Sequence, residues 1–196
     1  NKNVTNSIQL EVEPNDVIKV YADVIAFKAQ AGKLVTCELG KNDNLEVLDL
    51  MMNKITELDL SQLPKLRELA ITDNRLTTID LSKLKSLKEF YGSYNNVGTL
   101  DIKQNPSLEA LACAGMGLTE LDLSNNPKLE NLTAGNNNYT TFPDLSNKPA
   151  LKWIDMESCG MKEIDVTKFP KLKFLDLSGN QLTNIDLSKN TLLRKL

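Results

Sequence analysis

The chain has 196 residues, of which 41% are hydrophobic and 25% charged, with a formal net charge of −3 and no histidine. It contains no basic run, so we expect neither a nucleic-acid partner nor an anionic membrane surface as its target. No apolar stretch approaches the roughly 20 residues that span a bilayer. The sequence also shows no signal peptide, and its first residues neither support nor exclude export of the protein.

Residues 1–23 alternate apolar and polar side chains twice. Ile8, Leu10 and Val12 alternate before the turn sequence EPND, and the residues from Ile18 to Ala22 alternate after it. Alternation on both sides of a turn predicts a β-hairpin. We expect this N-terminal β-hairpin to cap the exposed core of the array that follows it.

From residue 24 onward the chain repeats a unit of 21 residues, with a single unit of 22. The first positions of the full units are Leu45, Leu66, Leu87, Leu108, Leu129, Leu151 and Leu172, and Leu193 begins a partial one. Each unit follows L-x-x-L-x-[apolar]-x-x-N-x-L-x-x-L-D-L-S, the signature of a leucine-rich repeat. We assign a degenerate first repeat to 24–44 and seven units with a partial eighth to 45–196, where "LLRKL" is expected to be a truncation or a minimal cap.

The repeat predicts a leucine-rich-repeat solenoid of the α/β class that is mostly β. Alternation at the third to seventh positions predicts one short strand per unit, with the fourth and sixth side chains pointing inward. Eight parallel strands about 4.8 Å apart make a curved sheet of roughly 35 Å on the concave face. The segment before the next leucine is short and often contains proline, which predicts 3₁₀ turns or extended chain on the convex side.

Two polar positions of the unit have expected structural roles. The ninth is asparagine at positions 53, 74, 95, 137 and 180, and we expect its amide to satisfy backbone groups in a buried turn. Met116 and Cys159 interrupt this column. The Asp-x-Ser pair is suited to local bonds that close the outer turn. Cys37, Cys113 and Cys159 fall at core positions, so we predict no disulfide, no metal site and no cofactor.

With unit ends such as "DLSKN" and "DLSNNPK", the chain resembles the short-period leucine-rich repeats of bacterial surface proteins of the internalin type, and above all versions common in gut commensal bacteria. The resemblance covers about residues 24–196. It implies a secreted or cell-surface anchored protein that binds host proteins or mucin with its concave face. The predicted strand cap differs from the helical cap that internalins usually have.

The outward side chains of the predicted sheet suggest where a ligand binds. The chain has only ten aromatic residues, yet Tyr91, Tyr94, Trp153 and Phe174 all fall on the concave face. Between the tyrosines and Trp153, the fourth unit presents only alanine and glycine, which predicts a shallow trough. Nearby carboxylates suit a basic group or sugar hydroxyls: Asp73, Asp155, Glu157 and Asp176. Large aromatic residues dominate binding hot spots, although these could also simply pack on one another across strands.

The leading functional hypothesis is a non-enzymatic, monomeric binding module of an exported bacterial protein, which recognises a protein or glycoprotein. A carbohydrate-binding module and a structural spacer in a larger surface protein remain alternatives. Asp155 and Glu157 have the spacing of a glycosidase pair. However, the sequence has no histidine, no nucleophile motif and no phosphate loop, so we do not expect an enzyme. The identity of the ligand is not contained in the sequence.

Overall fold

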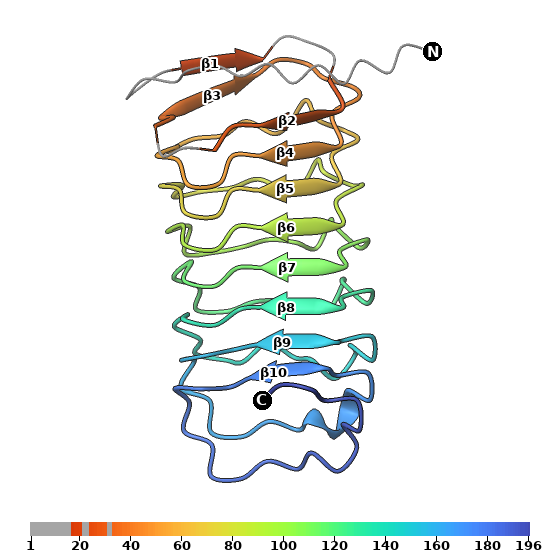
Figure 1. The fold of residues 1–196 in the computed structure, drawn as a ribbon. Helices are drawn as coiled ribbons and strands as arrows, with labels where there is room; N and C mark the ends of the chain where they lie inside the picture. Colours follow the sequence, from red (N-terminus) through yellow and green to blue (C-terminus); the bar gives the residue numbers. More distant parts are fainter. Residues whose placement is uncertain (1–16, 21–23, 31–32) are drawn as a thin grey trace.

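The computed structural model describes residues 17–20, 24–30 and 33–196, and its main feature is a ladder of eight parallel strands (Figure 1). Each repeat contributes one strand to the ladder, and consecutive repeats lie side by side in it. The strands are β2 (Ala26–Lys28), β4 (Val47–Asp49), β5 (Glu68–Ala70), β6 (Glu89–Tyr91), β7 (Ala110–Ala112), β8 (Asn131–Thr133), β9 (Trp153–Asp155) and β10 (Phe174–Asp176). The predicted solenoid, with eight strands and almost no helix, is confirmed.

Equivalent repeat positions pair with one another along the ladder. Leu69 pairs with Phe90, and Phe90 pairs with Leu111. The strands cover only positions three to five, so the predicted extent of positions three to seven was wrong. Ladder hydrogen bonds nevertheless continue beyond the strands, because the Ile71 amide donates to the Tyr91 carbonyl at 2.7 Å. The regular strand ends early because the eighth residue adopts a positive φ, which turns the chain away from the sheet.

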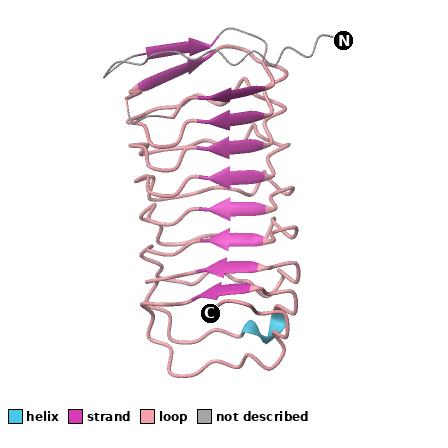
Figure 2. Ribbon diagram, viewed as in Figure 1, coloured by secondary structure: helices cyan, strands magenta, loops and turns pink. Residues whose placement is uncertain are grey.

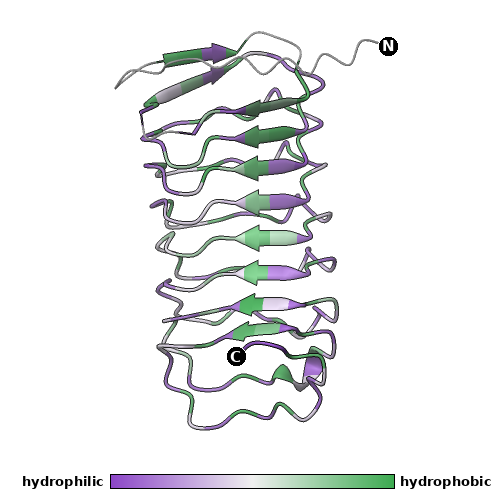
Figure 3. Ribbon diagram, viewed as in Figure 1, coloured by the Kyte–Doolittle hydropathy of each residue, from purple (hydrophilic) through white to green (hydrophobic). Residues whose placement is uncertain are grey.

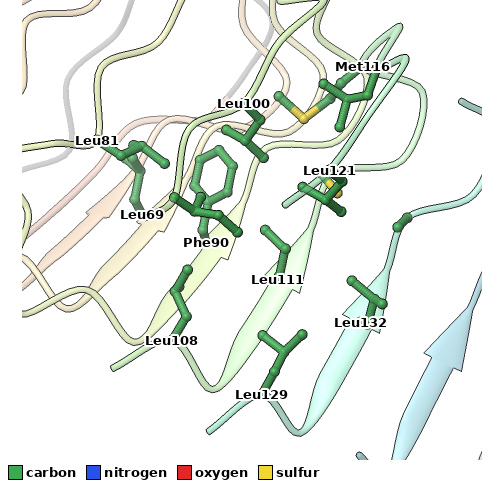
Figure 4. Close-up of a cluster of buried hydrophobic side chains, with 14 of the residues drawn as sticks. Leu69, Leu81, Phe90, Leu100, Leu108, Leu111, Met116, Leu121, Leu129 and Leu132 are labelled. Carbon is green, nitrogen blue, oxygen red and sulfur yellow. The ribbon is translucent and has the colours of Figure 1, made fainter. Parts of the chain in front are cut away.

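The core is a column of large aliphatic side chains that runs the length of the solenoid. Figure 4 shows Leu69, Phe90 and Leu111 pointing from their strands toward Leu81, Leu100 and Leu121 of the opposite side, and all six are buried. Burying one such side chain contributes about 1.5–3 kcal/mol. Apolar residues recur on every strand, separated by polar turns (Figure 3). This is the inward pattern that the repeat predicts.

Phe90 is the one aromatic residue at the fourth position of the seven full units, and its ring is accommodated by Gly92. A Cβ atom built on Gly92 would lie 2.3 Å from Cζ of Phe90 and 2.7 Å from Cε1. Other repeats combine an aliphatic fourth residue with a side chain at the sixth position, as in Leu132 and Ala134. The ring therefore occupies the space that a sixth-position side chain fills elsewhere.

The predicted asparagine column is confirmed as a ladder of buried amides. Asn95 accepts a hydrogen bond from the Leu76 amide at 3.0 Å, and its own amide donates to the carbonyls of Ile71 at 3.0 Å and Gly92 at 2.9 Å. The same three bonds recur in the other asparagine-containing units. Each asparagine thus joins two consecutive repeats and satisfies backbone groups that water cannot reach.

Where the column is broken, the asparagine of the next repeat makes an additional bond. Oδ1 of Asn137 accepts hydrogen bonds from the backbone amides of both Met116 and Leu118. Oδ1 of Asn180 accepts hydrogen bonds from the backbone amides of Cys159 and Met161 in the same way. The Cys159 thiol also lies 3.6 Å from the Ala134 carbonyl, the acceptor that an asparagine amide would reach. The two interruptions therefore leave the turn hydrogen-bonded.

The outer side of the solenoid consists of turns, extended chain and one 3₁₀ helix, η1 (Val166–Lys168), as predicted (Figure 2). In each full unit the aspartate of the outer turn accepts a hydrogen bond from the backbone amide two residues later, which belongs to a serine in most units, as from Ser82 to Asp80 at 2.8 Å. These bonds lower the pKa of Asp80. The aspartates of the other turns make the same bond.

The N-terminal region contains a second, two-stranded sheet. In it β1 (Val17–Val20) pairs in parallel with β3 (Thr36–Leu39), which is the later part of the degenerate first repeat. The first half of the predicted hairpin, with Ile8, Leu10 and Val12, lies outside the described residues, as does Ala22. In the part of the chain that is described, the partner of β1 is therefore β3. At the other end, Lys195 bridges to Phe174 and begins a further rung.

All three cysteines are buried, as predicted, and their thiols are free. Burial raises the pKa of the Cys37 thiol to about 11 and that of Cys113 to about 12. In the described ranges, no helix has the length and apolar character that crossing a membrane requires.

Candidate functional site

The candidate site lies on the outward side of the eight-stranded sheet, which we call the sheet face. It is formed by the third and fifth residues of each repeat unit, while the fourth residues point into the core. The predicted site residues Tyr91, Trp153, Asp155 and Phe174 belong to these strands. Tyr94, Asp73 and Glu157 lie just beyond the strand ends. A regular sheet therefore positions the first group, and the turn after it positions the second.

Trp153 is the largest exposed side chain of the sheet face, with 41% of its surface accessible. Its ring stacks on Phe174 of β10, with ring centroids 3.5 Å apart and an interplanar angle of 8°. The Lys195 ammonium covers the Phe174 ring at 5.2 Å from its centroid. Phe174 is therefore only 9% exposed and supports the indole. For this pair, the alternative that the aromatic residues pack across strands is correct.

Tyr91 of β6 is half-buried, and its hydroxyl donates a hydrogen bond of 2.7 Å to Glu89 on the same strand. Burial, and then the bond to Glu89 and its negative charge, raise the pKa of the Tyr91 phenol. The phenol thus stays protonated and keeps a fixed orientation. The Glu89 carboxylate is in turn occupied by this hydrogen bond.

A hollow of about 240 Å³ lies between Tyr91 and Trp153. Its floor consists of Ala110 and Ala112 on β7 and of Asn131 and Thr133 on β8, with the Leu111 backbone between the alanines. The hollow exists because the alanines rise only to Cβ above a sheet whose flanking strands carry rings. Its position is that of the trough expected from the small residues of the fourth unit.

In the seven full units the eighth residues form a column along the edge of the sheet face, and each has a positive φ: Met52, Asp73, Tyr94, Gly115, Asn136, Ser158 and Gly179. Glycine and asparagine adopt this conformation readily, whereas a bulky residue is strained by it. Tyr94 nevertheless adopts this strained conformation, with φ 58°, and its side chain is 59% exposed. Its ring lies over Gly115, where a Cβ atom would be 2.9 Å from the ring. Tyr94 is thus separated from the hollow by a turn.

Three of the predicted carboxylates lie on the sheet face or at its edge: Asp73, Asp155 and Glu157. Asp155 is half-buried, accepts a hydrogen bond from the Glu157 amide at 3.3 Å, and has a pKa raised by desolvation. Glu157 and Asp73 are exposed at the edge of the sheet face. Within the described ranges, no group of three or more cysteine, aspartate or glutamate residues is arranged to hold a metal ion. These carboxylates make the surroundings of Trp153 acidic.

Charges at the start of the strands are paired across neighbouring repeats. Lys88 contacts Glu109 at 2.7 Å, and Lys152 contacts Glu130 at 2.5 Å. These pairs are partly exposed, so each contributes little to stability. Their effect on the sheet face is to neutralise the row of charges that flanks the hollow.

Phe142, an exposed aromatic residue in the 22-residue unit, lies on the outer side and was not predicted from the sequence as a site residue. It stacks edge-on against Tyr139 at 6.5 Å and separates two open hollows of about 720 and 560 Å³. The larger hollow is also lined by Lys148, which is only 1% exposed and whose ammonium is 3.4 Å from the Asn147 carbonyl. The signal for this irregularity was the extra residue in the repeat.

Models of known families match two parts of the chain: "Leucine Rich repeats (2 copies)" over residues 43–86 and "Leucine Rich Repeat" over residues 171–196. No curated protein sequence matches the chain significantly. Among solved structures, the functional domain of InlJ from Listeria monocytogenes, which includes a cysteine ladder, is similar with 34% identity and a TM-score of 0.80. The match covers 87% of this chain and 38% of that chain.

Two further structures share the fold at lower identity. A leucine-rich-repeat protein of Leptospira interrogans has 24% identity and a TM-score of 0.72, over 84% of this chain and 48% of that one. Internalin C2 of Listeria monocytogenes has 24% identity and a TM-score of 0.69, over 79% and 71% of the two chains. The chain thus spans less than half the length of InlJ and of the Leptospira protein.

Proposed function

Because the chain is an internalin-like leucine-rich-repeat protein, we propose that it is a non-enzymatic recognition module of an exported bacterial protein. In this proposal its sheet face binds a protein or glycoprotein. The observation that carries the proposal is the hollow between Tyr91 and Trp153, which two fixed aromatic side chains flank on a rigid sheet. Aromatic residues with a polar group are the side chains that most often dominate binding energy.

Preorganisation supports the proposal. The Trp153 ring is held by Phe174, and the Tyr91 hydroxyl is held by Glu89. A ligand that binds between them therefore orders few additional side chains, which lowers the entropic cost of association. An exposed indole on a sheet is otherwise a liability for aggregation. Its retention beside an open hollow favours use as a contact surface.

The internalin resemblance supports a secreted or cell-surface location. Free thiols are compatible with that environment here, because Cys37, Cys113 and Cys159 are buried and burial raises the pKa of each. Thiolate is the reactive form, so a raised pKa slows oxidation. The proposed ligand is a host protein or a mucin-like glycoprotein, and the proposed active species is the monomer.

The test is surface plasmon resonance with the immobilised chain, using purified mucin and a panel of extracellular glycoproteins as analytes. The variant Ala112→Arg fills the hollow from a half-buried surface position and should abolish saturable binding. The variant Trp153→Ala should weaken binding at least about tenfold, as expected for an aromatic hot spot. The matched control Phe142→Ala removes an exposed aromatic residue from the outer side and should leave binding unchanged.

Two results would overturn the proposal. One is the absence of saturable binding to any of these analytes. The other is binding that Ala112→Arg and Trp153→Ala both leave intact, which would place the interaction elsewhere and make the sheet face a structural surface. Far-UV circular dichroism of each variant establishes that it is folded.

A further inference from the structure

The lining of the hollow indicates what kind of group it accepts. Its volume of about 240 Å³ lies below the roughly 300–1,000 Å³ of pockets that enclose a whole small molecule. Tyr91 on β6 and Trp153 on β9 are three strand intervals apart, or about 14 Å at the usual spacing between strands. The hollow is therefore suited to one ring-sized group of a larger ligand.

The lining carries no formal charge. It consists of a phenol, an indole, the methyl groups of Ala110 and Ala112, a hydroxyl and a carboxamide. The neighbouring carboxylate of Glu89 already accepts the Tyr91 hydroxyl, and Asp155 accepts the Glu157 amide. Burying a charged group against such a lining is unfavourable, because no group of opposite charge in the lining would compensate for its lost hydration. An anionic group would in addition meet the negative charges of Glu89 and Asp155.

The floor also offers polar groups that have no partner within the described chain. The side chains of Asn131 and Thr133 make no hydrogen bond there, and they lie beside the alanine methyl groups. A purely apolar occupant would desolvate this amide and hydroxyl without replacing their bonds to water, which is unfavourable for each group. The best occupant therefore has an apolar face and several hydroxyl groups.

On these grounds we infer that the hollow binds one uncharged pyranose ring of a glycan, with its C–H face against the aromatic side chains and its hydroxyls toward Asn131 and Thr133. The inference rests on the proposed function and names the part of the glycoprotein that the sheet face recognises. The stacked Trp153, fixed by Phe174, is the platform, and the alanines of β7 leave room for the ring. Sialylated and sulfated sugars are excluded by the surrounding carboxylates.

Saturation-transfer NMR and Trp153 fluorescence test the inference with methyl glycosides of glucose, galactose, mannose, N-acetylglucosamine and N-acetylgalactosamine, and with sialic acid. Trp153 is the only tryptophan, so its emission reports on this site. At least one neutral glycoside should give a saturable signal. Asn131→Ala should weaken it about fivefold, the equivalent of one hydrogen bond of about 1 kcal/mol, and Ala112→Leu should abolish it. Asn138→Ala, a change at an exposed asparagine outside the hollow, is the matched control and should have no effect.

The inference is overturned if no neutral glycoside binds, if Ala112→Leu leaves the signal unchanged, or if sialic acid binds more tightly than the neutral sugars. Mucin with and without its glycans separates this failure from that of the proposed function. Binding that survives removal of the glycans, yet is abolished by Ala112→Arg, keeps the proposed function and refutes the sugar site. Absence of any mucin or glycoprotein binding refutes the proposed function itself.

Discussion

The close approach of Gly92 to Phe90 makes a sharp prediction about the core. In Gly92→Ala the new Cβ atom would lie 2.3 Å from Cζ of Phe90, more than 1 Å inside the 3.4–4 Å of ordinary contact. Phe90 has no accessible surface, so its ring cannot move outward. Overpacking of this kind costs about 1–3 kcal/mol. The lower chain entropy of alanine in the unfolded state returns about 0.4–1 kcal/mol. We therefore expect a net loss of about 1–2 kcal/mol.

Phe90→Leu should rescue this variant. Alone it leaves unfilled volume beside Gly92, and each Å³ of cavity costs about 24 cal/mol in addition to the lost transfer energy. Combined with Gly92→Ala, it recreates the pair that the chain already uses at Leu132 and Ala134. The double variant should therefore lie within about 1 kcal/mol of the original chain, which corresponds to a favourable coupling of about 1–3 kcal/mol.

Urea denaturation followed by circular dichroism measures the free energy of unfolding of all four proteins. Ala134→Gly serves as control, since it should cost only about 0.5–1 kcal/mol and show no coupling to Phe90→Leu two strands away. A double variant whose loss equals the sum of the two single losses would refute the reasoning. So would a Gly92→Ala variant as stable as the original chain.

Four further outcomes follow from the ladders and turns. Asn137→Ala should cost about 2–4 kcal/mol in urea denaturation, because it leaves buried backbone groups without partners, whereas Asn138→Ala should change stability by less than about 0.5 kcal/mol. Gly179→Ala should lower stability by about 1–2 kcal/mol, because φ is +68° there. The folded-state pKa of Asp80 is lowered below its ordinary value of 3.8. The stabilisation that the Asp80 carboxylate gives is therefore present above pH 3.8 and is lost as the pH falls through the lowered pKa. In acid titrations, the stability of Asp80→Asn should fall less with decreasing pH than that of the original chain. Finally, an aromatic disulfide reagent should label Cys113 only when denaturant unfolds the protein, since its pKa is raised to about 12; rapid labelling of the folded chain would contradict its burial.

Much of the architecture could be predicted from the sequence, because the same pattern of apolar and polar residues recurs in every repeat. A leucine at the first position and a large apolar residue at the fourth position of every full unit specify the same buried contact in each repeat. Asn95 likewise specifies the same three hydrogen bonds as Asn74. Strand number, parallel pairing and the outer aspartate turns follow from these local and next-repeat interactions. The small fourth unit likewise predicted a trough between Tyr91 and Trp153, and a hollow lies there.

The tertiary structure decided the features that depend on how side chains of different repeats meet. The sequence predicted that Phe174 lies on the outward face. In the tertiary structure, however, the Trp153 ring and the Lys195 ammonium cover the Phe174 ring, so that Phe174 supports Trp153 and does not itself face a ligand. Pairing of β1 with β3 could not be read from alternation, since alternation specifies a strand and leaves its partner open. The physical reason is the same in both cases: periodicity determines which way a side chain points, whereas the neighbour that it meets depends on register and on the exact volumes packed around it.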